Sequence, residues 1–107
     1  MSQFIQDIKA KLLRPGIEGH YAHGNEMTFG YVTILPGSVM EEHSHPHEQI
    51  TYILEGSLEM QIGGEEVILH AGMVQVIPSN IPHAAKTEEG CKLIDVFSPV
   101  RADYAAR

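Results

Sequence analysis

The residues best suited to chemistry in this chain are histidines, and they are unevenly spaced. The chain has seven, and His43, His45 and His47 fall within five residues of one another. Imidazole nitrogens bind divalent transition metals, and a glutamine oxygen can complete such a set as a weaker ligand. Because side chains two apart on an extended chain share a face, His43 and His45 point the same way, and so does Gln49 if the chain regains its register beyond Pro46.

A third imidazole has to come from elsewhere in the fold, and His83 is the candidate. Prolines at positions 78 and 82 restrict the backbone there, as a directed ligand requires. The sequence therefore predicts one divalent metal ion held by His43, His45, Gln49 and His83. A His-X-His pair is also common on protein surfaces, and His47 is open to three roles: ligand, neighbour of the ligands or solvent-facing residue.

The predicted ligands carry no negative charge, which bears on the chemistry of the site. Three histidines and a glutamine leave the full charge on the ion, so it stays strongly Lewis acidic. This favours metal-assisted polar chemistry over oxygen chemistry. The remaining histidines, His20, His23 and His70, are scattered, and we expect them to lie on the surface or to form hydrogen bonds.

The elements that must position these residues are short strands. Apolar and polar residues alternate between clear turn signals, and Gly63-Gly64 is typical of a two-residue hairpin. Met27, Phe29, Tyr31 and Leu35 fall on one face of the second strand. A turn is expected at Glu55-Gly56. The predicted strands are 17–21, 27–35, 49–54, 57–62, 65–70, 73–77, 83–87 and 91–97.

The pattern predicts an all-β sandwich or barrel. Apolar spacing over residues 3–13 suits a short amphipathic helix or turn, with an irregular strand-like arm as the alternative. Residues 101–107 have room for one helical turn. We divide the chain into an N-terminal arm or short helix at 1–14 and a single barrel domain at 15–107.

Composition narrows the class of protein. The chain has 107 residues, of which 43% are hydrophobic, and its net charge is -7. Without clustered lysine and arginine, nucleic acid binding is disfavoured. No apolar run is long enough to span a membrane, and no secretion signal opens the chain, so we expect a cytoplasmic location. The single cysteine, Cys91, is expected to be a core residue.

The end of the chain adds three candidates. Asp95 interrupts the apolar run 93–97, and a carboxylate in such a place is either paired or functional. The alternative to a functional role is a structural one, in which Asp95 is bonded to the backbone or to Arg101. Arg101 suits a carboxylate ligand, which an acidic chain otherwise repels, although a surface arginine is equally consistent. Phe97 is expected to line the barrel.

These residues resemble the two motifs of the cupin superfamily. Gly37, His43, His45, Gln49 and Gly56 match the first motif, with Gln49 where most cupins have glutamate. The second motif is matched by Gly72, Pro78 and His83, whereas Asn80 replaces its glycine and Thr87 its asparagine. The resemblance covers about residues 30–100 and implies a cupin β-barrel (a double-stranded β-helix or jelly roll) with the ion inside its mouth. The metal implied is Ni, Zn, Fe, Mn, Co or Cu.

A closer resemblance is to the small pectin-degradation cupins of KdgF type, which share the string 43–49 and the ending 95–101. Those proteins convert the ring form of 4,5-unsaturated uronates, released from pectin or alginate, to the open keto form. The resemblance implies active-site roles for Asp95, Phe97 and Arg101, an anionic sugar as substrate and a homodimer. Two alternatives stay open: another metal cupin enzyme (dioxygenase, lyase or isomerase), and a non-catalytic protein that binds a small molecule.

Overall fold

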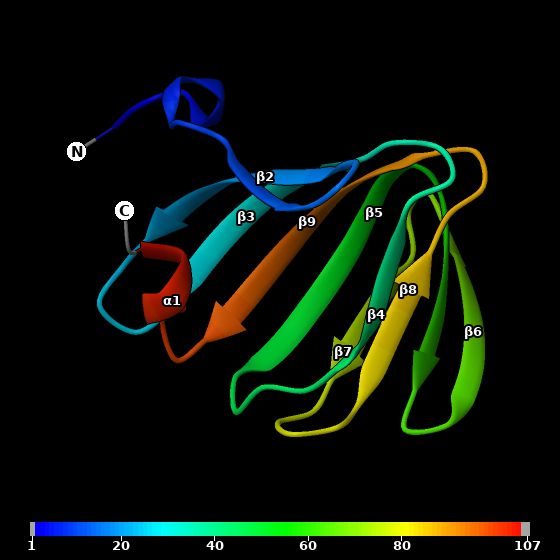
Figure 1. The fold of residues 1–107 in the computed structure, drawn as a ribbon. Helices are drawn as coiled ribbons and strands as arrows, with labels where there is room; N and C mark the ends of the chain where they lie inside the picture. The colour runs from blue at the N-terminus through cyan, green and yellow to red at the C-terminus, as the bar shows by residue number, and fades with distance from the viewer. Residues whose placement is uncertain (1, 106–107) are drawn as a thin grey trace.

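The computed structural model describes residues 2–105, and these form two sheets of antiparallel strands that face each other (Figure 1). Met1, Ala106 and Arg107 lie outside the described residues, so the ends of the predicted arm and tail are not covered. The elements in chain order are η1 (Ile5–Asp7), β1 (Lys11–Arg14), β2 (Ile17–His23), β3 (Thr28–Ile34), β4 (Val39–His43), β5 (Glu48–Ile62), β6 (Glu65–His70), β7 (Val74–Ile77), β8 (His83–Lys86), β9 (Cys91–Ser98) and α1 (Ala102–Ala105).

Strand β5 belongs to both sheets and joins them. Its first half pairs with β9 and β7, and its second half pairs with β6 and β8. Strands β1, β2 and β3 extend the first sheet beyond β9, and β4 extends the second beyond β8. The result is a nearly closed β-barrel, which confirms the predicted all-β fold class.

The turn predicted at Glu55-Gly56 is wrong, because β5 continues through it. The register between β5 and β9 shifts between Ile53 and Glu55, and Gly56 adopts a φ of 79°. A bulge of this kind bends a strand without ending it, and here it carries β5 from one sheet to the other. The hairpin at Gly63-Gly64 is confirmed, since both glycines have positive φ and Ile62 pairs with Glu65.

Of the alternatives for residues 3–13, the amphipathic helix is wrong, whereas a short turn and a strand-like arm are both present. Only Ile5–Asp7 forms a short 3-10 turn, and the strand-like alternative describes the rest, because β1 pairs with β2. Leu13 packs against the core whereas Leu12 is exposed, which is the alternation of a strand. Strand β4, for which the sequence carried no separate signal, pairs with β8. The helical turn expected near the C-terminus is α1.

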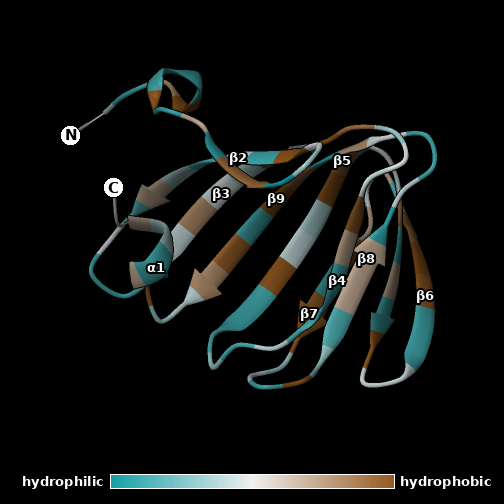
Figure 2. Cartoon of the chain, in the orientation of Figure 1, coloured by the Kyte–Doolittle hydropathy of each residue, from teal (hydrophilic) through white to brown (hydrophobic). Residues whose placement is uncertain are grey.

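The core lies between the two sheets. Bands of opposite hydropathy alternate along strands such as β5 and β9 (Figure 2), as expected when one face of each sheet is buried. The face of β3 that carries Phe29 and Tyr31 points outward, and its other face, with Val32 and Ile34, is buried. Cys91 is buried as expected, and burial raises the pKa of its thiol to about 11. Within residues 2–105, no helix has the length and apolar character needed to cross a membrane.

Candidate metal centre

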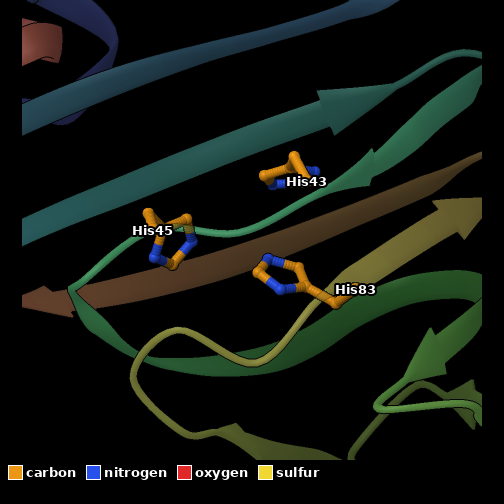
Figure 3. A group of neighbouring side chains, drawn as sticks. All are labelled: His43, His45 and His83. Carbon is orange, nitrogen blue, oxygen red and sulfur yellow. The ribbon is translucent and has the colours of Figure 1, made fainter.

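Three of the predicted ligands converge inside the barrel. His43 ends β4, His45 follows it in the loop, and His83 begins β8, so that their rings face one another (Figure 3). The candidate ligand atoms of the three all lie within 4.8 Å of one another. The register explains the meeting, because His43 lies directly opposite His83 in the β4–β8 pair. This geometry confirms that the three imidazoles form one group.

The hydrogen bonds of the three rings occupy Nδ1 and leave Nε2 of each ring free to bind a metal. Each Nδ1 lies beside a backbone carbonyl: His43 at 2.9 Å from Glu41, His45 at 3.0 Å from His47, and His83 at 2.8 Å from Ile81. Since a carbonyl only accepts, each Nδ1 carries the hydrogen and donates it. Each Nε2 therefore keeps a free lone pair in the neutral ring, which is what a metal ligand requires.

Gln49, the predicted fourth ligand, lies on β5 beside the three histidines. Its Nε2 donates to Thr51 Oγ1 at 3.0 Å and to Asp95 Oδ1 at 3.1 Å, which turns its Oε1 toward the histidines. Gln49 Oε1 lies 3.1 Å from His45 Nε2. Both atoms are acceptors in this arrangement, so the contact is unfavourable unless a cation lies between their lone pairs.

A second observation tests whether a cation fits. His83 Nε2 is buried and has no hydrogen-bond partner among the described residues, although a buried polar atom without a partner is costly. Burial also lowers the pKa values of His45 and His83, which keeps both rings neutral near pH 7. The residues present therefore fit a divalent transition ion, and imidazole-rich sets accept several metals.

His47 does not belong to this group. Its ring lies 5.4 Å from that of His45 between centroids, and its Nδ1 is buried without a hydrogen-bond partner among the described residues. His47 thus lies beside the ligands and not among them. Of the scattered histidines, His20 and His23 bond to Ile8 and Thr28, and His70 is exposed.

Asp95 lies beside the ligands in the same cavity. Its Oδ1 accepts hydrogen bonds from Thr51 at 2.6 Å and from Gln49, and not from the backbone or Arg101 as the structural alternative required. Burial raises the pKa of Asp95 to about 6, although the two hydrogen bonds and the charge of Arg101 oppose the rise. Thr51 was not predicted, yet it shares the face of Gln49 two residues along β5, so its position was readable from strand spacing.

Arg101 is buried, with 7% of its surface exposed, which removes the surface alternative. Its Nε and Nη2 donate to the two oxygens of Asp103 at 3.0 and 2.8 Å, and its guanidinium stacks on the rings of Tyr104 and Phe97. Asp103 and Tyr104 were missed by sequence reasoning. Only the turn of α1, which brings residues two and three positions on against Arg101, makes their contacts.

The cavity has a volume of about 60 Å³ and contains the ligands, Asp95, Phe97 and Arg101 in its walls. This is room for an ion with a few water molecules. Whether Asp95, Phe97 and Arg101 act on a substrate remains a prediction, as does the complete ligand set of His43, His45, Gln49 and His83.

Comparison with known proteins decides the family. The family model for the cupin domain matches residues 30–97, which is more than half of the chain. The chain belongs to the cupin family. This cupin is 43% identical over 75 residues to the pectin degradation protein KdgF of Dickeya dadantii (strain 3937), a match that covers 68% of each chain.

Solved structures agree with the fold. KdgF from Halomonas sp. is 31% identical to this cupin, with a TM-score of 0.87 and coverage of 94% of this chain and 96% of that one. An RmlC-like cupin from Shewanella frigidimarina NCIMB 400 is 26% identical, with a TM-score of 0.89 and coverage of 95% and 93%. The resemblance to KdgF-type cupins predicted from the sequence is thus confirmed.

Proposed function

We propose that this cupin is a metal-dependent enzyme of pectin breakdown, which opens and tautomerises the ring form of 4,5-unsaturated uronates. The observation that carries the proposal is the arrangement of one cavity. Four neutral donors converge there, Asp95 is hydrogen-bonded to one of them, and the cation of Arg101 stands in the same wall. The likeness to a protein of pectin degradation supports the choice of substrate class.

His43, His45, Gln49 and His83 would hold the ion, which supplies Lewis acidity toward the oxygens of the substrate. Arg101 binds the uronate carboxylate through Nη1, since its Nε and Nη2 are bonded to Asp103. Because Asp103 balances much of the charge of Arg101, this contact acts chiefly as a hydrogen bond that orients the carboxylate. Phe97 provides an apolar wall beside Arg101.

Asp95 moves the proton. As the bond between the anomeric carbon and the ring oxygen breaks, the anomeric hydroxyl loses its proton and becomes an aldehyde. The ring oxygen becomes the ketone oxygen at C5, and C4 gains a proton, so that the reaction is an isomerisation without a redox partner. Asp95 Oδ1 is occupied by Thr51 and Gln49, which leaves Oδ2 to accept and return that proton.

The test follows the ultraviolet absorbance of the C4=C5 bond in unsaturated galacturonate. We expect the metal-loaded protein to accelerate its loss at least tenfold over buffer. His83→Ala and chelated protein should fall to the rate in buffer, while His70→Ala, which changes an exposed histidine outside the site, keeps full activity. A rate equal to that of buffer with metal-loaded wild type would reject the proposal.

Two further measurements on the same protein distinguish the alternative functions. Oxygen consumption that depends on added Fe or Cu would identify a dioxygenase instead, and tight retention of the sugar without turnover would identify a binding protein. Asp95→Asn keeps an acceptor for Thr51 and Gln49, so we expect it to bind metal normally but to lose turnover. The anionic sugar, the cytoplasmic location and the homodimer remain predictions.

A further inference from the structure

The wall of the metal cavity contains a buried tyrosine, Tyr21. Only 6% of its surface is exposed, and it lines the cavity together with Asp95 and Arg101. The registers explain this location, because Tyr21 of β2 lies opposite Gly30 of β3, and Gly30 lies opposite Asp95 of β9. Since directly paired residues point to the same face of a sheet, Tyr21 and Asp95 belong to one row on its inner face.

Two glycines hold the ring of Tyr21 against this face. A Cβ on Gly30 would lie 2.4 Å from Tyr21 Cε1, and a Cβ on Gly19 would lie 2.7 Å from the hydroxyl oxygen. Both glycines are inside strands, and neither has the positive φ that would by itself favour glycine. A glycine in a strand interior often marks the close approach of another group. Here that group is the Tyr21 ring, which Tyr104 also contacts at 4.7 Å between centroids.

The hydroxyl group of Tyr21 is not used by the fold. It has no hydrogen-bond partner within residues 2–105, and its oxygen is not fully enclosed, in contrast to His83 Nε2. A phenylalanine would pack on the two glycines equally well. Burial and the nearby charge of Asp95 raise the pKa of Tyr21, so the hydroxyl keeps its proton and acts as a donor.

A protonated phenol in this place suits a sugar hydroxyl. Ligand sites combine apolar walls with a few polar groups that fix the orientation of the ligand. The cavity has room for a few water molecules, so a hydroxyl group of a bound sugar can take the place of one of them. An unsaturated uronate carries hydroxyl groups at C2 and C3, for which the ion, Asp95 and Arg101 provide no partner in the mechanism above.

We propose that Tyr21 is a substrate-binding residue, whose hydroxyl donates a hydrogen bond to a hydroxyl oxygen of the uronate at C2 or C3. Gly19 and Gly30 are then positioning residues, since they give the ring its place. This inference rests on the proposed function, because it concerns how the same cavity recognises its sugar. A tyrosine with a purely structural role would need only its ring.

The experiment compares the metal-loaded wild type with Tyr21→Phe in the ultraviolet assay. The variant keeps the ring and deletes only the hydroxyl, so we expect kcat/KM to fall about five- to tenfold, chiefly through KM. Metal affinity and the free energy of unfolding should stay as in wild type. Tyr52→Phe is the matched control, because Tyr52 lies on the outer face of the same sheet and is 41% exposed. A wild-type KM in Tyr21→Phe would overturn the proposal.

Gly30→Ala tests the positioning of the ring. Its Cβ forces the ring away from the sheet, so we expect KM to rise in this variant too. Adding Tyr21→Phe to Gly30→Ala should then change KM by less than about twofold, because the hydroxyl is already displaced. Effects of the two substitutions that multiply in full would overturn the positioning role of Gly30.

Failure of the proposed function gives a different result. If metal-loaded wild type does not turn the uronate over, calorimetric titration with unsaturated galacturonate decides the role of Tyr21. A Kd that is about five- to tenfold higher in Tyr21→Phe would support it. Equal Kd values, or a wild type that binds no uronate, would overturn it.

Discussion

Three motif glycines, Gly37, Gly56 and Gly72, have nearly equal φ values of 83°, 79° and 92° but different surroundings. A Cβ at Gly37 or Gly72 would meet no atom within 4 Å, whereas a Cβ at Gly56 would lie 2.1 Å from the carbonyl oxygen of Gly90. Three single variants, each with alanine at one of these positions, therefore separate the effect of a left-handed backbone from the effect of a close approach between chain segments.

The magnitudes follow from these contacts. A left-handed backbone costs an alanine about 1–2 kcal/mol, which is all that Gly37→Ala and Gly72→Ala should lose. In Gly56→Ala the turn before β9 must also retreat by about 1.3 Å to reach an ordinary contact. Overpacking of this kind costs about 1–3 kcal/mol, and a lost backbone hydrogen bond about 1 kcal/mol. We expect Gly56→Ala to lose about 3–6 kcal/mol in total.

Urea unfolding followed by circular dichroism measures the difference, since the chain contains no tryptophan to report by fluorescence. A loss of this size is a large part of the stability of a small domain. If Gly56→Ala loses no more free energy of unfolding than Gly37→Ala, the close approach of β5 to the Gly90 turn does not constrain this position. The reasoning from the 2.1 Å contact would then be refuted.

Three further predictions concern the cavity. His83→Ala should weaken Ni²⁺ or Zn²⁺ binding in calorimetry by about 100-fold or more, whereas His70→Ala should bind normally. In metal-free protein the pKa of Asp95 is about 6, above its usual 3.8, so its stabilising contribution is present below pH 3.8 and is lost as pH rises through 6. Asp95→Asn should therefore gain on the order of 3 kcal/mol over wild type at pH 7 and nothing at pH 3.5, and equal curves from urea unfolding would contradict this. Arg101→Lys loses the paired bonds to Asp103 and should raise the KM for the uronate about tenfold with a smaller change in kcat.

Much of the fold was predictable because the sequence signals of strands and turns are local. Alternation and turn residues predicted the strands, and Gly63-Gly64 predicted its hairpin, since both signals act over a few residues. The wrong turn predicted at Glu55-Gly56 has the same cause, because it too was judged from a local signal. A glycine with positive φ fits a turn or a bulge equally well, and only the partners of β5 on both sides decide that the chain continues. The secondary structure of residues 3–13 was ambiguous in the sequence, and the pairing of β1 with β2 decides it for the second part of this segment.

In the candidate metal centre, too, some features were predictable from the sequence and others only from the tertiary structure. The sequence alone determined the donor types, and the spacing of His43, His45 and Gln49 with a distant His83 sufficed to expect one shared ion, because side chains two apart on a strand share a face. Only the tertiary structure decided which nitrogen of each ring is free and which way the Gln49 amide turns. Backbone carbonyls two residues away set the ring orientations, and they do so only in the local backbone conformation that the folded chain imposes. The Gln49 amide is set by Thr51 on its own strand and by Asp95, which β9 brings beside β5 only in the folded sheet.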